Sequence, residues 1–109
     1  MHELIEHNKT AIIAICDQFK VERMYAFGSV VGVNFNDKSD IDILLIFRED
    51  LCVRNYTSYF FEIKYRLENL LTRSIDLITQ RSLTNPYLIQ SINDTKQLIY
   101  EFKNKKIIV

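Results

Sequence analysis

The sequence predicts a small α/β domain, with a mixed β-sheet flanked by helices. Three observations lead to this fold class. Apolar runs of strand length alternate along the chain with longer segments whose apolar residues recur every three or four positions. The 109 residues fit one domain, and 48% of them are hydrophobic, enough to bury a core without disulfides or a structural metal. The few strands expected allow a mixed rather than a fully parallel sheet.

The N-terminal segment is expected to form one amphipathic helix. Its apolar residues share one helical stripe, and charged residues take the other positions. The stripe consists of Leu4, Ile5, Ile12, Ile15, Cys16 and Phe19. A loop and strand over residues 21–27 should follow, with 24–27 as the apolar strand candidate, then a short helix or turn over 30–35. Residues 36–39 have the composition of a turn that leads into a second strand over 41–47.

The second half of the chain repeats the alternation of helix and strand. Apolar residues at three-and-four spacing predict a long helix over residues 56–71 that packs on the sheet, and a strand over 74–78 follows. Asn85 and Pro86 have the pattern of a helix cap followed by proline at the first helical position. The final helix is expected to bear Ile89, Ile92, Ile99 and Phe102.

Composition narrows the function classes. Fourteen basic and fourteen acidic residues balance, which argues against strong nucleic-acid binding. The cysteines, Cys16 and Cys52, lie among apolar residues without metal-ligand spacing, so we expect reduced, packed thiols and no zinc site. Because no apolar run resembles a signal peptide or reaches membrane-spanning length, we expect a cytoplasmic protein with no membrane partner.

The motif with the most chemistry is Gly28-Ser29 followed, after ten residues, by Asp40-Ile41-Asp42. Side chains alternate along a strand, so Asp40 and Asp42 should emerge on one face, about 6 to 7 Å apart. Two acids at that distance suit Mg²⁺, which binds through a few carboxylates plus substrate phosphates. Gly28 would let a phosphate approach the backbone closely, and Ser29 would offer a hydroxyl and cap a following helix.

Context decides how specific this motif is. With seven aspartates in the chain, an Asp-x-Asp triplet arises by chance with roughly even odds. Both parts of the motif, however, sit at the ends of predicted strands, as a phosphate and metal site requires. The alternative is that Gly28-Ser29 only turns the chain and Asp40 only ends a loop.

The segment GSVVGVNFNDKSDID, residues 28–42, resembles the signature of the minimal nucleotidyltransferases of the polymerase-beta superfamily. That resemblance implies a polymerase-beta-like fold and a third carboxylate on a neighbouring strand, for which Asp76 is the matching residue. Its place in the alternation is right, since Asp76 would face away from Ile75 and Leu77. The alternative for Asp76 is a strand-end acid that pairs with Arg73.

The resemblance also implies roles for these residues. Asp40, Asp42 and Asp76 would hold Mg²⁺ against ATP, the turn at Gly28-Ser29 would hold the terminal phosphates, and Asp76 would act as the base. Many members carry an Arg or Lys in the loop after Gly-Ser, whereas Lys38 is the only cation of this loop. Lys38 is therefore the candidate for binding the triphosphate, although a lysine beside a surface turn is commonly just solvated.

Minimal nucleotidyltransferases occur as antitoxins beside a HEPN-domain ribonuclease toxin, and some transfer AMP from ATP to a tyrosine of that toxin. The resemblance therefore implies an AMP-transferring antitoxin with a HEPN-domain toxin as partner. One alternative is a catalytically weak relative that neutralises its toxin by binding alone. Another is transfer to a small molecule such as an aminoglycoside, but superfamily members of that kind typically have an extra domain for the acceptor.

Overall fold

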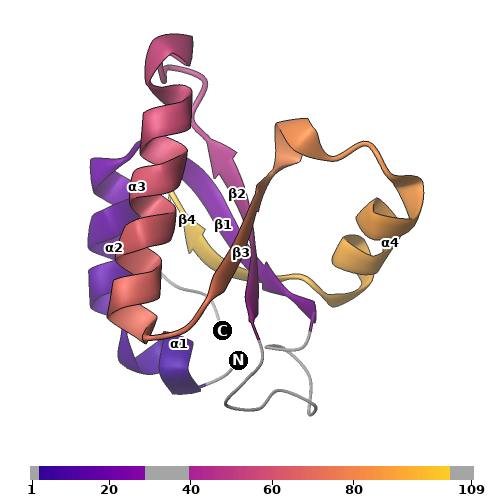
Figure 1. The fold of residues 1–109 in the computed structure, drawn as a ribbon, viewed down its shortest axis with the longest axis horizontal. Helices are drawn as coiled ribbons and strands as arrows, with labels where there is room; N and C mark the ends of the chain where they lie inside the picture. Colours follow the sequence, from indigo (N-terminus) through magenta and orange to yellow (C-terminus); the bar gives the residue numbers. More distant parts are fainter. Residues whose placement is uncertain (1–2, 29–39, 104–109) are drawn as a thin grey trace.

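A four-stranded mixed sheet organises the computed structural model, which describes residues 3–28 and 40–103. The strands lie in the order β3-β2-β1-β4 (Figure 1). β2 runs antiparallel to β1 and parallel to β3, and β4 pairs antiparallel with β1. Their bounds are Val21–Phe27 for β1, Ile41–Phe47 for β2, Ile75–Thr79 for β3 and Gln97–Glu101 for β4. The predicted mixed sheet flanked by helices is confirmed.

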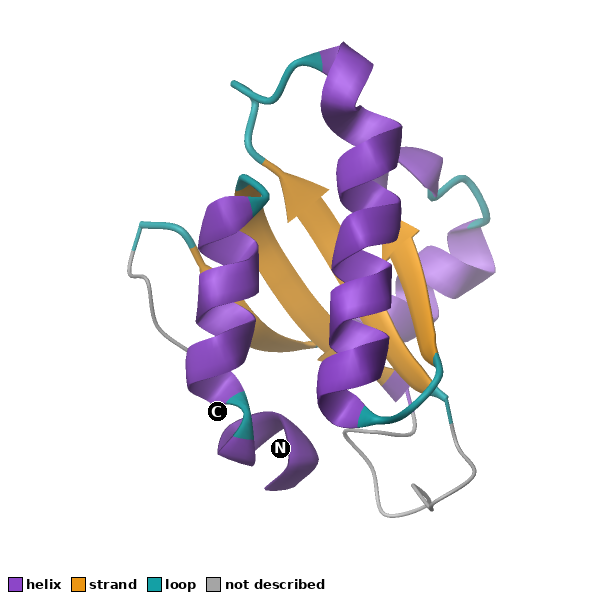
Figure 2. Ribbon diagram, turned by 60° about the vertical axis from the view of Figure 1, so that its left-hand side comes forward, coloured by secondary structure: helices purple, strands orange, loops and turns teal. Residues whose placement is uncertain are grey.

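The helices divide between the two faces of the sheet. α2 (Lys9–Gln18) and α3 (Val53–Leu71) lie side by side across one face, as Figure 2 shows. α4 (Pro86–Thr95) lies on the opposite side, after the short helix η2 (Gln80–Ser82). One face is therefore covered by two helices, and the other carries a single short helix.

Two groups of buried side chains follow from this layering. The main core fills the space under α2 and α3, and a smaller cluster of Phe27, Leu44 and Ile92 forms under α4. Side chains of β2 alternate between them, because Ile43 and its neighbours two residues away enter the main core while Leu44 enters the smaller one. β2 is thus apolar on both faces, which explains its unbroken apolar run.

The N-terminal helix was expected to be continuous, and this prediction was wrong. α1 (Glu3–His7) ends before Asn8, and α2 begins after it. The Asn8 side chain donates a hydrogen bond from Nδ2 to the Leu4 carbonyl oxygen, 2.8 Å away. Asparagine often competes with helix continuation by bonding to nearby backbone groups. Ile5 and Ile12 are still buried together in the main core, so the apolar stripe predicted the burial although not the break.

The last helix was also predicted too long. Asn85 caps α4 as expected, because its Oδ1 accepts hydrogen bonds from the backbone N–H groups of Tyr87 and Leu88. The helix ends at Thr95, however, and Ile99 lies in β4. Pairing with β1 gives the backbone hydrogen bonds of this segment a partner and buries Ile99, which explains why a strand replaces the expected helix.

Two further expectations concern the segment before β2 and the long helix. The turns and short helix predicted over residues 30–39 lie outside the described residues. The long helix α3 begins at Val53, three residues before the first apolar position of its predicted stripe, and ends at Leu71 as expected. None of the helices within the described ranges is long and apolar enough to cross a membrane.

Candidate active site

Asp42 and Asp76 lie directly opposite each other on neighbouring strands. The parallel register pairs Asp42 of β2 with Asp76 of β3, and adjacent strands run about 4.8 Å apart. Both acids follow the alternation of their strands: Leu44 and Ile78, two residues further on, contact the small cluster under α4. The acid pair therefore lies on the face of the sheet that α2 and α3 leave open.

The surroundings of Asp42 disfavour its negative charge. Burial of the half-buried side chain, then the charges of Asp76 and Asp40, and finally a hydrogen bond with the Asp76 side chain raise the pKa of Asp42 to about 6. A hydrogen bond between two carboxyl groups requires a proton on one of them. The two carboxyl groups therefore repel each other when both are ionised.

This donor set fits Mg²⁺. The ion favours carboxylate oxygens, and repulsion between neighbouring carboxylates is what a divalent cation relieves. Asp40 is exposed just before β2 and is close enough to affect the pKa of Asp42. Across residues 3–28 and 40–103, no three acidic, His or Cys side chains already stand within ligating distance of one point. The structure brings Asp42 and Asp76 together, and metal ligation by any of the three acids stays a prediction.

Gly28 directly follows β1 and lies beside this pair. Its φ of +70° is a backbone conformation that residues with a side chain rarely adopt. A Cβ built at this position would lie 2.5 Å from Oδ2 of Asp42, so the space a side chain would need is taken by that carboxylate. Glycine here therefore serves two purposes: it permits the bend, and it leaves room for Asp42. Ser29 and Lys38, which complete the predicted phosphate site, lie outside the described residues.

The end of α4 reaches the same place, which the sequence did not indicate. The backbone N–H of Gly28 donates a hydrogen bond to Oγ1 of Thr95, with 3.3 Å between the two atoms, although 67 positions separate the residues. The next residue, Lys96, holds its ammonium group 4.8 Å from the centre of the Tyr25 ring on β1. A cation thus approaches the acid-bearing face of the sheet from a part of the chain remote from the motif.

A family comparison agrees with this geometry. The family described as polymerase beta nucleotidyltransferase matches residues 10–105, which is most of the chain. The chain is a member of that family. The resemblance drawn from residues 28–42 is therefore confirmed, and the nucleotidyltransferase fold explains why the acid pair and the Gly28 bend occur at neighbouring strand ends.

Individual relatives of known sequence or structure are similar to this chain. The nucleotidyltransferase is similar to "Putative protein adenylyltransferase MJ1379" of Methanocaldococcus jannaschii, with 38% identity over 86 residues, 77% of this chain and 80% of the relative. A solved structure described as a putative minimal nucleotidyltransferase is 26% identical, covers 89% of this chain and 95% of its own, and superposes with a TM-score of 0.68.

A second solved structure comes from a complex. It is a tri-AMPylated Shewanella oneidensis HEPN toxin with its MNT antitoxin, and the match covers 92% of this chain and 75% of that one, with a TM-score of 0.61. Its identity to this chain is 22%, so the likeness shows the shared fold. The curated relative shows that the chain belongs to the same family as a putative protein adenylyltransferase.

Proposed function

We propose that this nucleotidyltransferase transfers AMP from ATP, with Mg²⁺, to a tyrosine hydroxyl of a HEPN-domain toxin, and so acts as an antitoxin. The observation that carries the proposal is the Asp42–Asp76 pair, held across two strands next to the Gly28 bend. The name of the Methanocaldococcus jannaschii relative and the AMPylated toxin bound to the Shewanella oneidensis antitoxin support the same reaction and the same kind of partner.

In this proposal the acids bind the metal, and the segment after β1 binds the phosphates. Asp40, Asp42 and Asp76 would hold Mg²⁺, which when bound neutralises charge on the phosphates. Gly28 and Ser29 would seat the terminal phosphates through backbone and hydroxyl groups, with Lys38 adding positive charge.

The transfer itself needs a base near the acceptor. The tyrosine oxygen attacks the α-phosphorus, the bond from that phosphorus to the bridging oxygen breaks, and pyrophosphate leaves. Asp76 would take the proton of the tyrosine hydroxyl. Asp76 is exposed on β3, the last strand of the sheet on that side, whereas Asp42 is half-buried on β2. The more accessible of the two acids is therefore the one that an acceptor carried by another protein would meet.

The test is the intact mass of the HEPN-domain toxin after incubation with the nucleotidyltransferase, ATP and Mg²⁺. We expect an AMP adduct with wild type and none with Asp42→Asn or Asp76→Asn. Asp50→Asn is the matched control. Asp50 is an exposed acid that forms an ion pair with Lys20, and it lies beyond the end of β2 that is remote from Asp42. Neutralisation of the toxin without any adduct would instead establish the alternative, inhibition by binding alone.

A further inference from the structure

A cavity of about 280 Å³ opens between α4 and the sheet, on the face that carries the acid pair. Its floor comes from Tyr25 of β1 and from Leu44 and Ile46 of β2, and Ile92 of α4 forms part of the opposite wall. Leu44 is also a member of the small buried cluster under α4. The cavity is thus built largely from regular elements, with apolar side chains on both of its walls.

Two observations connect this cavity to the acid pair. Along β2, Leu44 and Ile46 follow Asp42 on the same side of the strand, at about 7 and 13 Å by the strand rise. At the end of α4, Thr95 accepts the hydrogen bond from Gly28 while its neighbour Lys96 lines the cavity. A molecule whose phosphates rest at Gly28 and Asp42 would therefore extend its other end over Leu44.

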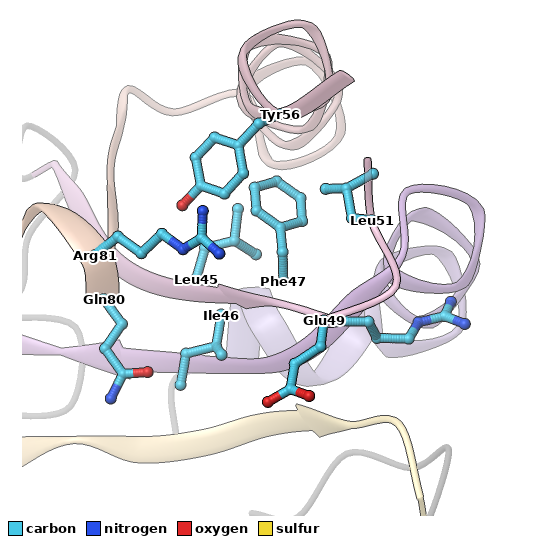
Figure 3. A pocket seen from close by; sticks show the side chains of 9 residues that line it. Leu45, Ile46, Phe47, Glu49, Leu51, Tyr56, Gln80 and Arg81 are labelled. Carbon is cyan, nitrogen blue, oxygen red and sulfur yellow. The ribbon is translucent and has the colours of Figure 1, made fainter. Parts of the chain in front are cut away.

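The polar groups of the cavity include two side-chain amides and two cations, Arg23 and Lys96. Gln80 and Asn93 both line it, one after the end of β3 and one on α4. Figure 3 shows Gln80 on the same side of β2 as Ile46, away from Tyr56 and Arg81. In the part of the chain that the structure describes, neither amide has a recorded hydrogen-bond partner. A side-chain amide offers a donor and an acceptor together, the pair that matches the exocyclic amine and a ring nitrogen of adenine.

We propose that this cavity holds the base of the nucleotide, and that Gln80 and Asn93 make it selective for adenine. The inference rests on the proposed function for the position of the phosphates. The volume of the cavity, about 280 Å³, suits the base and part of the sugar of one nucleotide, since sites for whole drug-sized ligands begin at about 300 Å³. Apolar side chains from both walls enclose the flat faces of the base, and the amides meet its edge.

Lys96 completes the arrangement. Its ammonium group lies over the Tyr25 ring and adjoins the residue that contacts Gly28. This places a positive charge where the sugar and the α-phosphate of the bound nucleotide would pass. Lys96 therefore supplies, from the end of α4, a cation close to the proposed path of the nucleotide.

The test separates the base from the phosphates. Calorimetry measures binding of ATP, GTP, UTP and inorganic tripolyphosphate, each with Mg²⁺, to wild type and to the double variant Gln80→Leu, Asn93→Leu. Both positions are exposed, so the fold should tolerate leucine. Gln90→Leu is the matched control, because Gln90 lies on the same helix but bonds to Asp94 and does not line the cavity.

We expect wild type to bind ATP at least tenfold more tightly than UTP or tripolyphosphate, and more tightly than GTP. The double variant should lose about tenfold in ATP affinity, as expected for two hydrogen bonds, with tripolyphosphate binding unchanged. Gln90→Leu should match wild type. If wild type binds ATP no better than tripolyphosphate, or the double variant keeps its full ATP affinity, the base site is wrong while the phosphate site stands. If tripolyphosphate also fails to bind, the proposed function fails with it.

Discussion

Asp42 is the residue on which the candidate site depends. Burial, followed by the charges of Asp76 and Asp40, raises its pKa to about 6. A carboxylate in such surroundings destabilises the folded chain until a proton or a cation offsets its charge. The residue proposed to bind Mg²⁺ therefore lowers the stability of the metal-free protein at neutral pH.

We expect Asp42→Asn to raise the unfolding temperature of the metal-free protein at about pH 7. The pKa of Asp42 rises from 3.8 to about 6 on folding. Protonation of Asp42 therefore contributes stability that is fully present below about pH 4, and this contribution is lost as the pH rises through 6. Because solvent screens a half-exposed carboxylate, we expect a gain of about 1 kcal/mol, or a few degrees.

Thermal unfolding of wild type and Asp42→Asn at both pH values checks this prediction. The difference between the two proteins should be present at about pH 7 and shrink towards about pH 4, where wild-type Asp42 is protonated. A variant that unfolds below wild type at neutral pH would show that Asp42 makes a stabilising contact that the pKa does not reflect.

Gly28 has two separate reasons to be glycine, and they can be measured separately. Gly28→Ala should destabilise the fold by about 1 to 2 kcal/mol from the positive φ alone, with a further loss from the contact of the new methyl group with Asp42. Denaturant unfolding of Gly28→Ala measures the sum, and nucleotide binding should fall with it.

A double-mutant cycle with Asp42→Ala separates the two contributions. Removing the carboxylate should relieve the steric part, so Gly28→Ala should cost less stability in the Asp42→Ala background than in wild type. Equal costs in both backgrounds would mean that the backbone conformation alone requires glycine at this position.

At the scale of elements, the sequence predicted β1, β2 and β3 because each contains a short apolar run or an alternation of apolar and polar residues. It did not predict β4. Ile89, Ile92 and Ile99 fit a helical period by coincidence, and only the open edge of β1 shows why the last of them belongs to a strand. Local periodicity contains no information about a partner strand more than 70 residues away.

The residues of the candidate site likewise include some that the sequence predicted and some that it did not. Asp42 could be predicted from its place in the alternation of its strand. Asp76 could be predicted because the family resemblance implies a third carboxylate and its place in the alternation fits. Thr95 and Lys96 could not, since their nearness to Gly28 and Tyr25 depends on how α4 folds back over the sheet. Short-range patterns thus found the acids, and tertiary packing supplied the groups around them.

The contact between α4 and the Gly28 bend yields a prediction at this scale. Thr95→Val keeps the shape of the side chain but removes the oxygen that accepts the hydrogen bond from Gly28. We expect a loss of about 1 kcal/mol in stability and weaker nucleotide binding, measured by denaturant unfolding and calorimetry. Thr95→Ser, which retains the hydroxyl, should resemble wild type. Equal behaviour of the valine and serine variants would show that this contact does not position the bend.

At the scale of the whole molecule, the layering places the chemistry. Two helices occupy one face of the sheet, so the acid pair on the other face is bordered by α4 and by the edge of β3 (Figures 1 and 2). An acceptor on another protein could reach Asp76 from this edge while the nucleotide lies towards α4. The fold thereby offers separate approaches for the two proposed substrates.

The central claim is that Asp42 and Asp76 together bind a nucleotide with Mg²⁺, and thermal unfolding with and without Mg²⁺ and ATP tests it directly. A ligand at about a hundred times its dissociation constant adds about 2.7 kcal/mol of stability, so wild type and Asp50→Asn should unfold several degrees higher when both are present. Asp42→Asn and Asp76→Asn should show no such rise, whatever their starting temperatures. An equal rise in all four proteins would contradict the account.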